Sequence, residues 1–132
     1  MRLWHQTLIP YLPRAQLLGQ HRECCALRGR SWGRKHSTVD YVFKYNPYRL
    51  YCYHVLVTDE MKKRGYKVDE RWYDPQYRGR NCLPNKDINT EICIKNTPIF
   101  PEHDLRYLKE CIENLYKKGA IFFVFSKSNK IP

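Results

Sequence analysis

Apolar side chains recur with a period close to 3.6 in residues 14–28, a pattern typical of a helix that packs on one side. Pro13 suits the first helical turn, where its missing N–H leaves no hydrogen bond unmade, and Gly29 suits the end of a helix. The helix is therefore expected to run from Arg14 to Arg28. Its apolar positions are Leu17, Leu18, Cys24, Cys25 and Leu27.

A second helical pattern covers residues 47–64. Asn46 can cap this helix, Pro47 suits its first position, and Gly65 follows a basic last turn. The apolar face is expected to comprise Tyr48, Tyr51, Cys52, Val55 and Leu56, widened by Leu50, Val57 and Met61.

A third helix is predicted over residues 102–118, and a weaker helical pattern covers residues 38–44. Residues 66–100 are dominated by Asp, Asn, Pro and Tyr, which predicts loops and short turns. Such a long connection in a compact domain often carries function. The apolar face of the third helix is expected to comprise Leu105, Leu108, Cys111, Ile112 and Leu115.

The 132 residues suit one domain with one core, so we expect a compact all-α single domain over residues 1–132. It should have about three main helices and long irregular connections, with the tail 120–132 left unassigned. No secretory signal is visible, so the six cysteines are expected to be free thiols in a reducing cytoplasm. The longest apolar run, residues 120–125, is too short to span a membrane.

Lys and Arg number 24 against 13 Asp and Glu, which gives a formal net charge of +11. This excess predicts attraction to polyanions such as nucleic acid. Residues 28–36 concentrate the charge in a Gly-containing link, where it can contact phosphates or lie as a solvated loop. The basic residues of the link are Arg28, Arg30, Arg34, Lys35 and His36.

Arg22 and Glu23 are adjacent on the first predicted helix. Their side chains are about 100° apart, so both can border one cleft, the carboxylate to move a proton and the guanidinium to hold a phosphate. They can equally be an ordinary solvated pair. His21 and Cys25 are spaced to share a metal, but no second pair has ligand spacing, so no metal or cofactor is expected.

Several short motifs occur in an order shared with a known family. They are Thr7-Leu8, Leu12, Leu17, Arg22-Glu23, Arg34-Lys35-His36, Lys63-Arg64-Gly65 followed by Tyr66, and Tyr77-Arg78-Gly79. In these motifs, over about the first 80 residues, the chain resembles the pyrimidine-dimer DNA glycosylases typified by phage endonuclease V. The resemblance implies a helical repair enzyme that releases a damaged pyrimidine from double-stranded DNA and nicks the abasic site, without a metal.

The resemblance also implies residue roles. The nucleophile would be the chain's own α-amine, here that of Met1, which forms a Schiff base with the sugar. Glu23 would assist ring opening and proton transfer, and Arg22 would hold phosphates beside the lesion. The whole expected DNA interface comprises Arg2, Arg22, Arg28, Arg30, Arg34, Lys35, His36 and Arg78.

The chain departs from the family pattern in three places. Arg2 is bulky and should prevent removal of Met1, Ala26 stands where the family has an Arg, and the tail 120–132 lacks the family's aromatic pattern. One alternative is therefore the same fold kept for nucleic-acid binding without chemistry. A metal protein built from His21, Cys25 and distant ligands is another, and a monomer is expected in each case.

Overall fold

The computed structural model describes residues 2–34, 38–90 and 98–118, and within these ranges the chain is helical and contains no strand. The expected all-α fold is confirmed. In chain order the elements are η1 (Gln6–Tyr11), α1 (Arg14–Arg28), η2 (Asp40–Lys44), α2 (Pro47–Lys63), η3 (Glu70–Tyr73) and α3 (Leu105–Lys117). The expectations for Met1, Lys35, His36 and the tail 120–132 lie outside the described residues.

Side-chain caps set the first residues of α2 and α3. α1 has the predicted bounds, and the Asn46 side chain caps α2 by accepting a hydrogen bond from the Tyr48 amide at 3.0 Å. The predicted start of α3 at residue 102 was three residues too early. Asp104 accepts a hydrogen bond from the Tyr107 amide at 2.8 Å, which makes Asp104 the cap and Leu105 the first helical residue.

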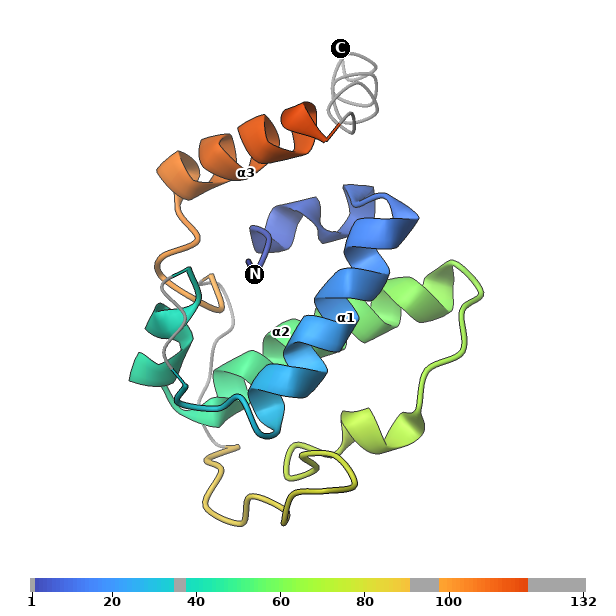
Figure 1. The fold of residues 1–132 in the computed structure, drawn as a ribbon, viewed down its shortest axis with the longest axis vertical. Coiled ribbons are helices and arrows are strands. Elements are labelled where there is room, and N and C mark those ends of the chain that lie inside the picture. Colours follow the sequence, from blue (N-terminus) through green and yellow to red (C-terminus); the bar gives the residue numbers. More distant parts are fainter. Residues whose placement is uncertain (1, 35–37, 91–97, 119–132) are drawn as a thin grey trace.

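α1 packs across α2, and the segment before α1 lies between these two helices and α3 (Figure 1). Side chains from all four parts form one core, with α3 contributing its buried residues from the opposite side of the N-terminal segment. Core residues include Leu3, Leu8, Leu17, Leu27, Leu50, Tyr53, Val57, Phe100 and Leu115.

The apolar face predicted for α2 was correct in part. The predicted members Leu50, Val57 and Met61 are buried, together with Tyr53, His54 and Thr58, which were not predicted. Of the remaining predicted members, Leu56 is exposed and Tyr48, Tyr51, Cys52 and Val55 are half-buried. The polar residues His54 and Thr58 belong to the buried face, which hydropathy alone does not indicate, because their polar groups have hydrogen-bond partners inside the protein. The Thr58 hydroxyl donates to the His54 carbonyl at 3.1 Å. Leu105, expected on the face of α3, is also exposed.

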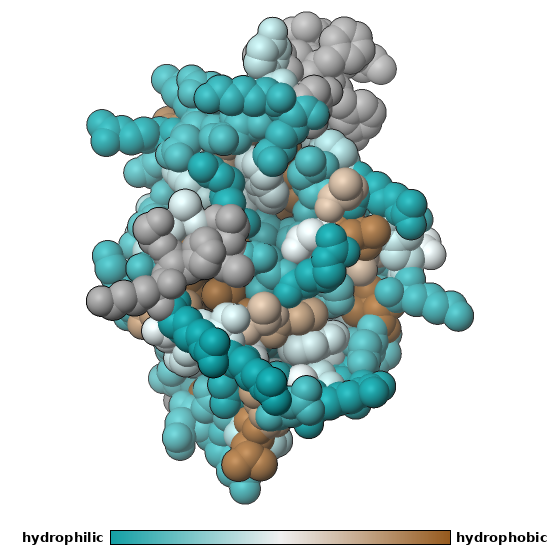
Figure 2. Space-filling model, viewed as in Figure 1, coloured by the Kyte–Doolittle hydropathy of each residue, from teal (hydrophilic) through white to brown (hydrophobic). Residues whose placement is uncertain are grey.

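Hydrophilic side chains cover most of the face seen in Figure 2 and project from it, and apolar residues form only small separate patches. Among the described helices, none has the length and apolar character that a membrane crossing requires.

Candidate active site

A cleft of about 420 Å³ lies between α1, the N-terminal segment and the C-terminal end of α3. We call it the Glu23 cleft. It is lined by Arg2, Trp4, Gln16, Gly19, Gln20, Glu23, Thr38, Asn114 and Lys118. The cationic side chains of Arg2 and Lys118 therefore line the same cleft as the carboxylate of Glu23.

Gln20 attaches the N-terminal segment to the wall of this cleft. Its buried side chain accepts a hydrogen bond from the Trp4 amide at 2.7 Å and donates one to the Arg2 carbonyl at 2.9 Å. Tyr53 of α2 completes the arrangement, because its hydroxyl contacts both the Trp4 carbonyl at 2.6 Å and Gln20 Oε1 at 2.9 Å. The backbone of residues 2–4 is thus fixed one helical turn from Glu23.

α3 holds the same segment from the other side. The Tyr107 hydroxyl donates to the Leu3 carbonyl, and Arg2 forms an ion pair with Glu110 at 3.3 Å. The Arg2 guanidinium also lies 5.7 Å from the centres of the Trp4 and Tyr107 rings. Arg2, expected to contact DNA, is therefore half-buried and bound to α3 in this structure.

Glu23 lines the cleft and Arg22 lies at its rim. Glu23 is half-buried, with its Oε1 atom shielded from solvent. Arg22 is exposed, and its guanidinium folds back toward Gly19 of the cleft wall, where the Cβ of an alanine would lie 3.8 Å from Arg22 Nη2. A buried carboxylate oxygen beside an exposed guanidinium can exchange a proton with a bound substrate while the cation binds a phosphate.

Arg28 and Arg78, both expected to contact DNA, bind the protein's own backbone. Arg28 is buried and donates to the carbonyls of Trp72, Asp74 and Tyr77 at 2.9–3.1 Å. Arg78 donates in return to the carbonyls of Arg28 and Gly29 at 2.9 and 3.0 Å. Burial lowers the pKa of Arg28, with nearby acidic groups opposing this effect. The two arginines join the end of α1 to the long loop.

Two further predicted contacts, Arg30 and Arg34, are exposed, as is Arg80 of the loop. Arg30 and Arg34 follow the C-terminal end of α1, and Arg80 lies on the loop that Arg78 hydrogen-bonds to that end. A larger hollow of about 690 Å³ adjoins this end, between Trp32, Leu50, Tyr77 and Lys86, and it does not include Glu23. Charge and aromatic rings therefore gather at this end of α1, while the candidate catalytic carboxylate lies nearer its middle.

The sequence did not reveal the residues that build the cleft. Gln20, Tyr53 and Tyr107 act through hydrogen bonds between elements distant in the sequence, and such bonds leave no periodic signal. Gln20 alone carried a hint, since it is a polar residue in line with the buried Leu17, Cys24 and Leu27.

A separate cluster of possible metal ligands brings together His21, Cys25 and His54. Burial lowers the pKa of His54 well below its ordinary value and that of His21 less strongly, with the neighbouring Arg28 acting in the same direction on both. Burial raises the pKa of the Cys25 thiol to about 11. All three side chains are therefore uncharged at neutral pH.

The family model described as pyrimidine dimer DNA glycosylase matches residues 1–74 of the chain. The match begins with the N-terminal segment and contains α1, α2, Arg22 and Glu23. Neither the curated proteins nor the solved structures that were compared with the chain gave a match.

Proposed function

The match covers more than half of the chain, so the protein belongs to the pyrimidine dimer DNA glycosylase family, and we propose that it releases damaged pyrimidines and then cuts the strand as an AP lyase. Its substrate would be double-stranded DNA, and it would act as a monomer. The observation that carries this proposal is the Glu23 cleft, in which a shielded carboxylate, an exposed Arg22 and the fixed N-terminal segment lie together.

The nucleophile in this proposal is the α-amine of Met1. An α-amine with a pKa of about 8 is partly neutral at neutral pH, unlike an ordinary lysine. One trans peptide unit spans about 3.8 Å between Cα atoms, so the α-amine of Met1, the residue joined to Arg2, can reach the cleft that Arg2 lines. The hydrogen bonds of Gln20 and Tyr107 to residues 2–4 support this placement.

The amine would form a bond to C1′ of the sugar, and the electron pair of the glycosidic bond would leave with the base. Loss of the amine proton and opening of the sugar ring then give the Schiff base. Glu23 would carry protons in these steps and stabilise the developing positive charge. Abstraction of a C2′ proton and release of the 3′ phosphate would complete the strand cut.

Arg22 would bind a phosphate beside the lesion, because its guanidinium is exposed at the rim of the cleft. Arg30 and Arg34, with Lys35 and His36 between Arg34 and η2, would extend the contact along the backbone. Arg28 and Arg78 support this surface indirectly by fastening the loop to α1. We therefore assign them no phosphate contact.

The test uses duplex oligonucleotides that carry a single cyclobutane pyrimidine dimer, an abasic site or no damage. We expect wild-type protein to cut the first two and spare the third, and Glu23→Gln to bind without cutting. Glu113→Gln serves as a matched control, because it makes the same substitution at an exposed carboxylate of α3 that does not line the cleft, and it should cut as wild type. Salt-sensitive binding of all three duplexes with no cutting would contradict the proposal and favour a DNA-binding protein without chemistry.

A further inference from the structure

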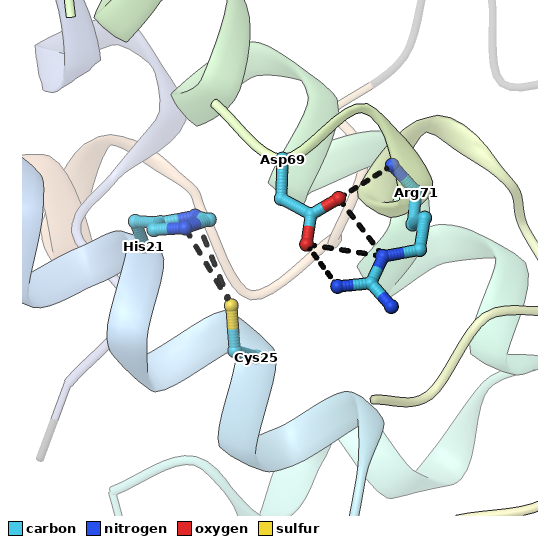
Figure 3. A network of polar contacts seen from close by, with 4 residues as sticks. All are labelled: His21, Cys25, Asp69 and Arg71. Carbon is cyan, nitrogen blue, oxygen red and sulfur yellow. Dashed lines mark hydrogen bonds and ion pairs between the residues drawn. The ribbon is translucent and has the colours of Figure 1, made fainter. Parts of the chain in front are cut away.

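Three side chains with metal-binding atoms converge between α1 and α2. His21 Nδ1 lies 2.8 Å from His54 Nε2, and Cys25 Sγ lies 3.8 and 3.9 Å from these two nitrogens. Figure 3 shows the Cys25 sulfur directed at the His21 ring from one turn further along α1. Two elements thus contribute one compact triangle of donor atoms.

The triangle is close to the size that a tetrahedral zinc ion requires. Bonds of about 2.0–2.1 Å to nitrogen and about 2.3 Å to sulfur place two nitrogen ligands about 3.3 Å apart and each nitrogen about 3.5 Å from the sulfur. The observed N–N separation is shorter and the N–S separations are longer, each by about half an ångström or less. Small rotations of the side chains would remove these differences.

We propose that His21, Cys25 and His54 form a binding site for zinc. Two imidazoles and a thiolate are ligands that zinc prefers, and together they fill three of its four positions. The site joins α1 to α2, and zinc bound there would stabilise the folded chain by an amount that rises with the logarithm of the free zinc concentration above its dissociation constant. This proposal does not rest on the DNA chemistry assigned to the Glu23 cleft.

The site lies on the side of α1 away from Glu23. His21 and Cys25 are each two residues from Glu23, which places them about 200° around the helix from it. A hollow of about 360 Å³ reaches Cys25 from the surface, lined also by Ala26, Trp72 and Cys82. This hollow gives an ion a path to the ligands and leaves room for a water in the fourth position.

Asp69 is near the cluster but is not assigned as a ligand. Its carboxylate is engaged with Arg71, at 2.7 Å between Asp69 Oδ2 and Arg71 Nη2 (Figure 3). Within the part of the chain that the structure describes, the assigned ligands are therefore His21, Cys25 and His54.

Zinc binding would change two hydrogen bonds of His54. The contact of His54 Nε2 with His21 Nδ1 at 2.8 Å would be replaced by bonds from both nitrogens to the ion. Arg28 donates to His54 Nδ1 at 2.8 Å, but a neutral imidazole that binds zinc through Nε2 carries its proton on Nδ1. That contact must break, and Arg28 keeps its three carbonyl acceptors in the loop. We therefore expect weaker binding than at a site where a carboxylate or carbonyl supports each histidine.

The test titrates metal-free, reduced full-length protein with Co²⁺, which reports thiolate ligation by a near-ultraviolet charge-transfer band, and then with Zn²⁺. We expect one Co²⁺ per chain, displacement by Zn²⁺, and a higher melting temperature with Zn²⁺. Cys25→Ser should lose the charge-transfer band, and His54→Gln should bind Zn²⁺ more weakly by at least roughly tenfold. Cys52→Ser, which alters another half-buried helix thiol, should behave as wild type.

Two outcomes would overturn the proposal. The first is the absence of the band and of any melting shift with Zn²⁺ in protein that circular dichroism shows to be folded. The second is a band that survives Cys25→Ser and disappears in Cys82→Ser, which would assign the thiolate to the neighbouring loop. Both variants are compared as folded proteins, so a folding defect is not mistaken for loss of the site.

Discussion

The side-chain oxygen of Gln20 accepts a hydrogen bond from the backbone amide of Trp4 at 2.7 Å, one helical turn before Glu23. This relationship sets the position of the N-terminal segment on α1. The Gln20 side-chain nitrogen also donates to the Arg2 carbonyl. α1 therefore positions both the Glu23 carboxylate and the N-terminal segment. The proposed chemistry depends on that common support.

Replacing Gln20 by Leu should destabilise the protein by about 2–3 kcal/mol, because the Trp4 amide and the Tyr53 hydroxyl would lose a buried acceptor. Urea unfolding at equilibrium measures the change. Gln16→Leu alters the cleft one turn earlier and should cost less than about 0.5 kcal/mol. Equal losses in the two variants would show that the Gln20 hydrogen bonds do not hold the segment.

Gly19→Ala separates stability from activity. Gly19 lies inside α1, so an alanine should stabilise the helix by about 0.5–1 kcal/mol. Its methyl group would enter the Glu23 cleft 3.8 Å from Arg22 Nη2, and we expect slower cutting of dimer-containing DNA. Urea unfolding and single-turnover cutting test the two parts. A stabilised variant that cuts as fast as wild type would show that substrate does not occupy this part of the cleft.

Substitution of Arg28 should lower the stability of the protein, whereas substitution of Arg30 should weaken DNA binding. Arg28→Met leaves several buried acceptors without a donor and should cost about 2–4 kcal/mol of stability. Arg30→Met alters an exposed residue and should leave stability nearly unchanged while lowering the salt dependence of DNA binding by about one unit of slope. Thermal unfolding and binding at several salt concentrations distinguish them. An unchanged salt slope in Arg30→Met would remove Arg30 from the interface.

Stability should fall in acid because of His103. Burial lowers the pKa of this residue to about 3, and the nearby His5 acts in the same direction. Between pH 6.5 and 3 the unfolded chain binds a proton that the folded chain does not, so stability is full above this range and is lost as pH falls through it. The loss should be on the order of 2 kcal/mol between pH 7 and pH 5.

Urea unfolding of His103→Gln across the same pH range checks this assignment. The variant should show a flatter pH dependence, with His5, His21 and His54 contributing to the remaining slope because their pKa values are also lowered. An identical slope in wild type and variant would contradict the role given to His103.

The sequence predicted the parts of the fold that depend on local chemistry. α1 followed from its periodicity and its flanking Pro13 and Gly29, and the start of α2 followed from Asn46. The buried face of α2 was predicted only in part, because His54 and Thr58 satisfy their polar groups inside the protein. Hydropathy cannot distinguish a buried polar residue with partners from a solvated one.

The sequence singled out candidate residues of the site but not the residues that position them. Adjacency on one helix allowed Arg22 and Glu23 to border one cleft but left a solvated pair equally open. It gave no sign of Gln20, which attaches the N-terminal segment to α1. Arg28 and Arg78 were expected to contact DNA, but both donate to backbone carbonyls. Positive charge in a sequence does not indicate whether a guanidinium faces solvent or the protein backbone. Only the tertiary structure makes that distinction.

The most direct test of the central claim is cyanoborohydride trapping on a duplex with one abasic site, after mass spectrometry has established the N-terminus. We expect a covalent complex with wild-type protein, none with protein whose α-amine is acetylated, and much slower strand cutting by Glu23→Gln. Equal trapping by the acetylated protein, or no trapping by wild-type protein that binds the duplex, would contradict an α-amine nucleophile beside Glu23.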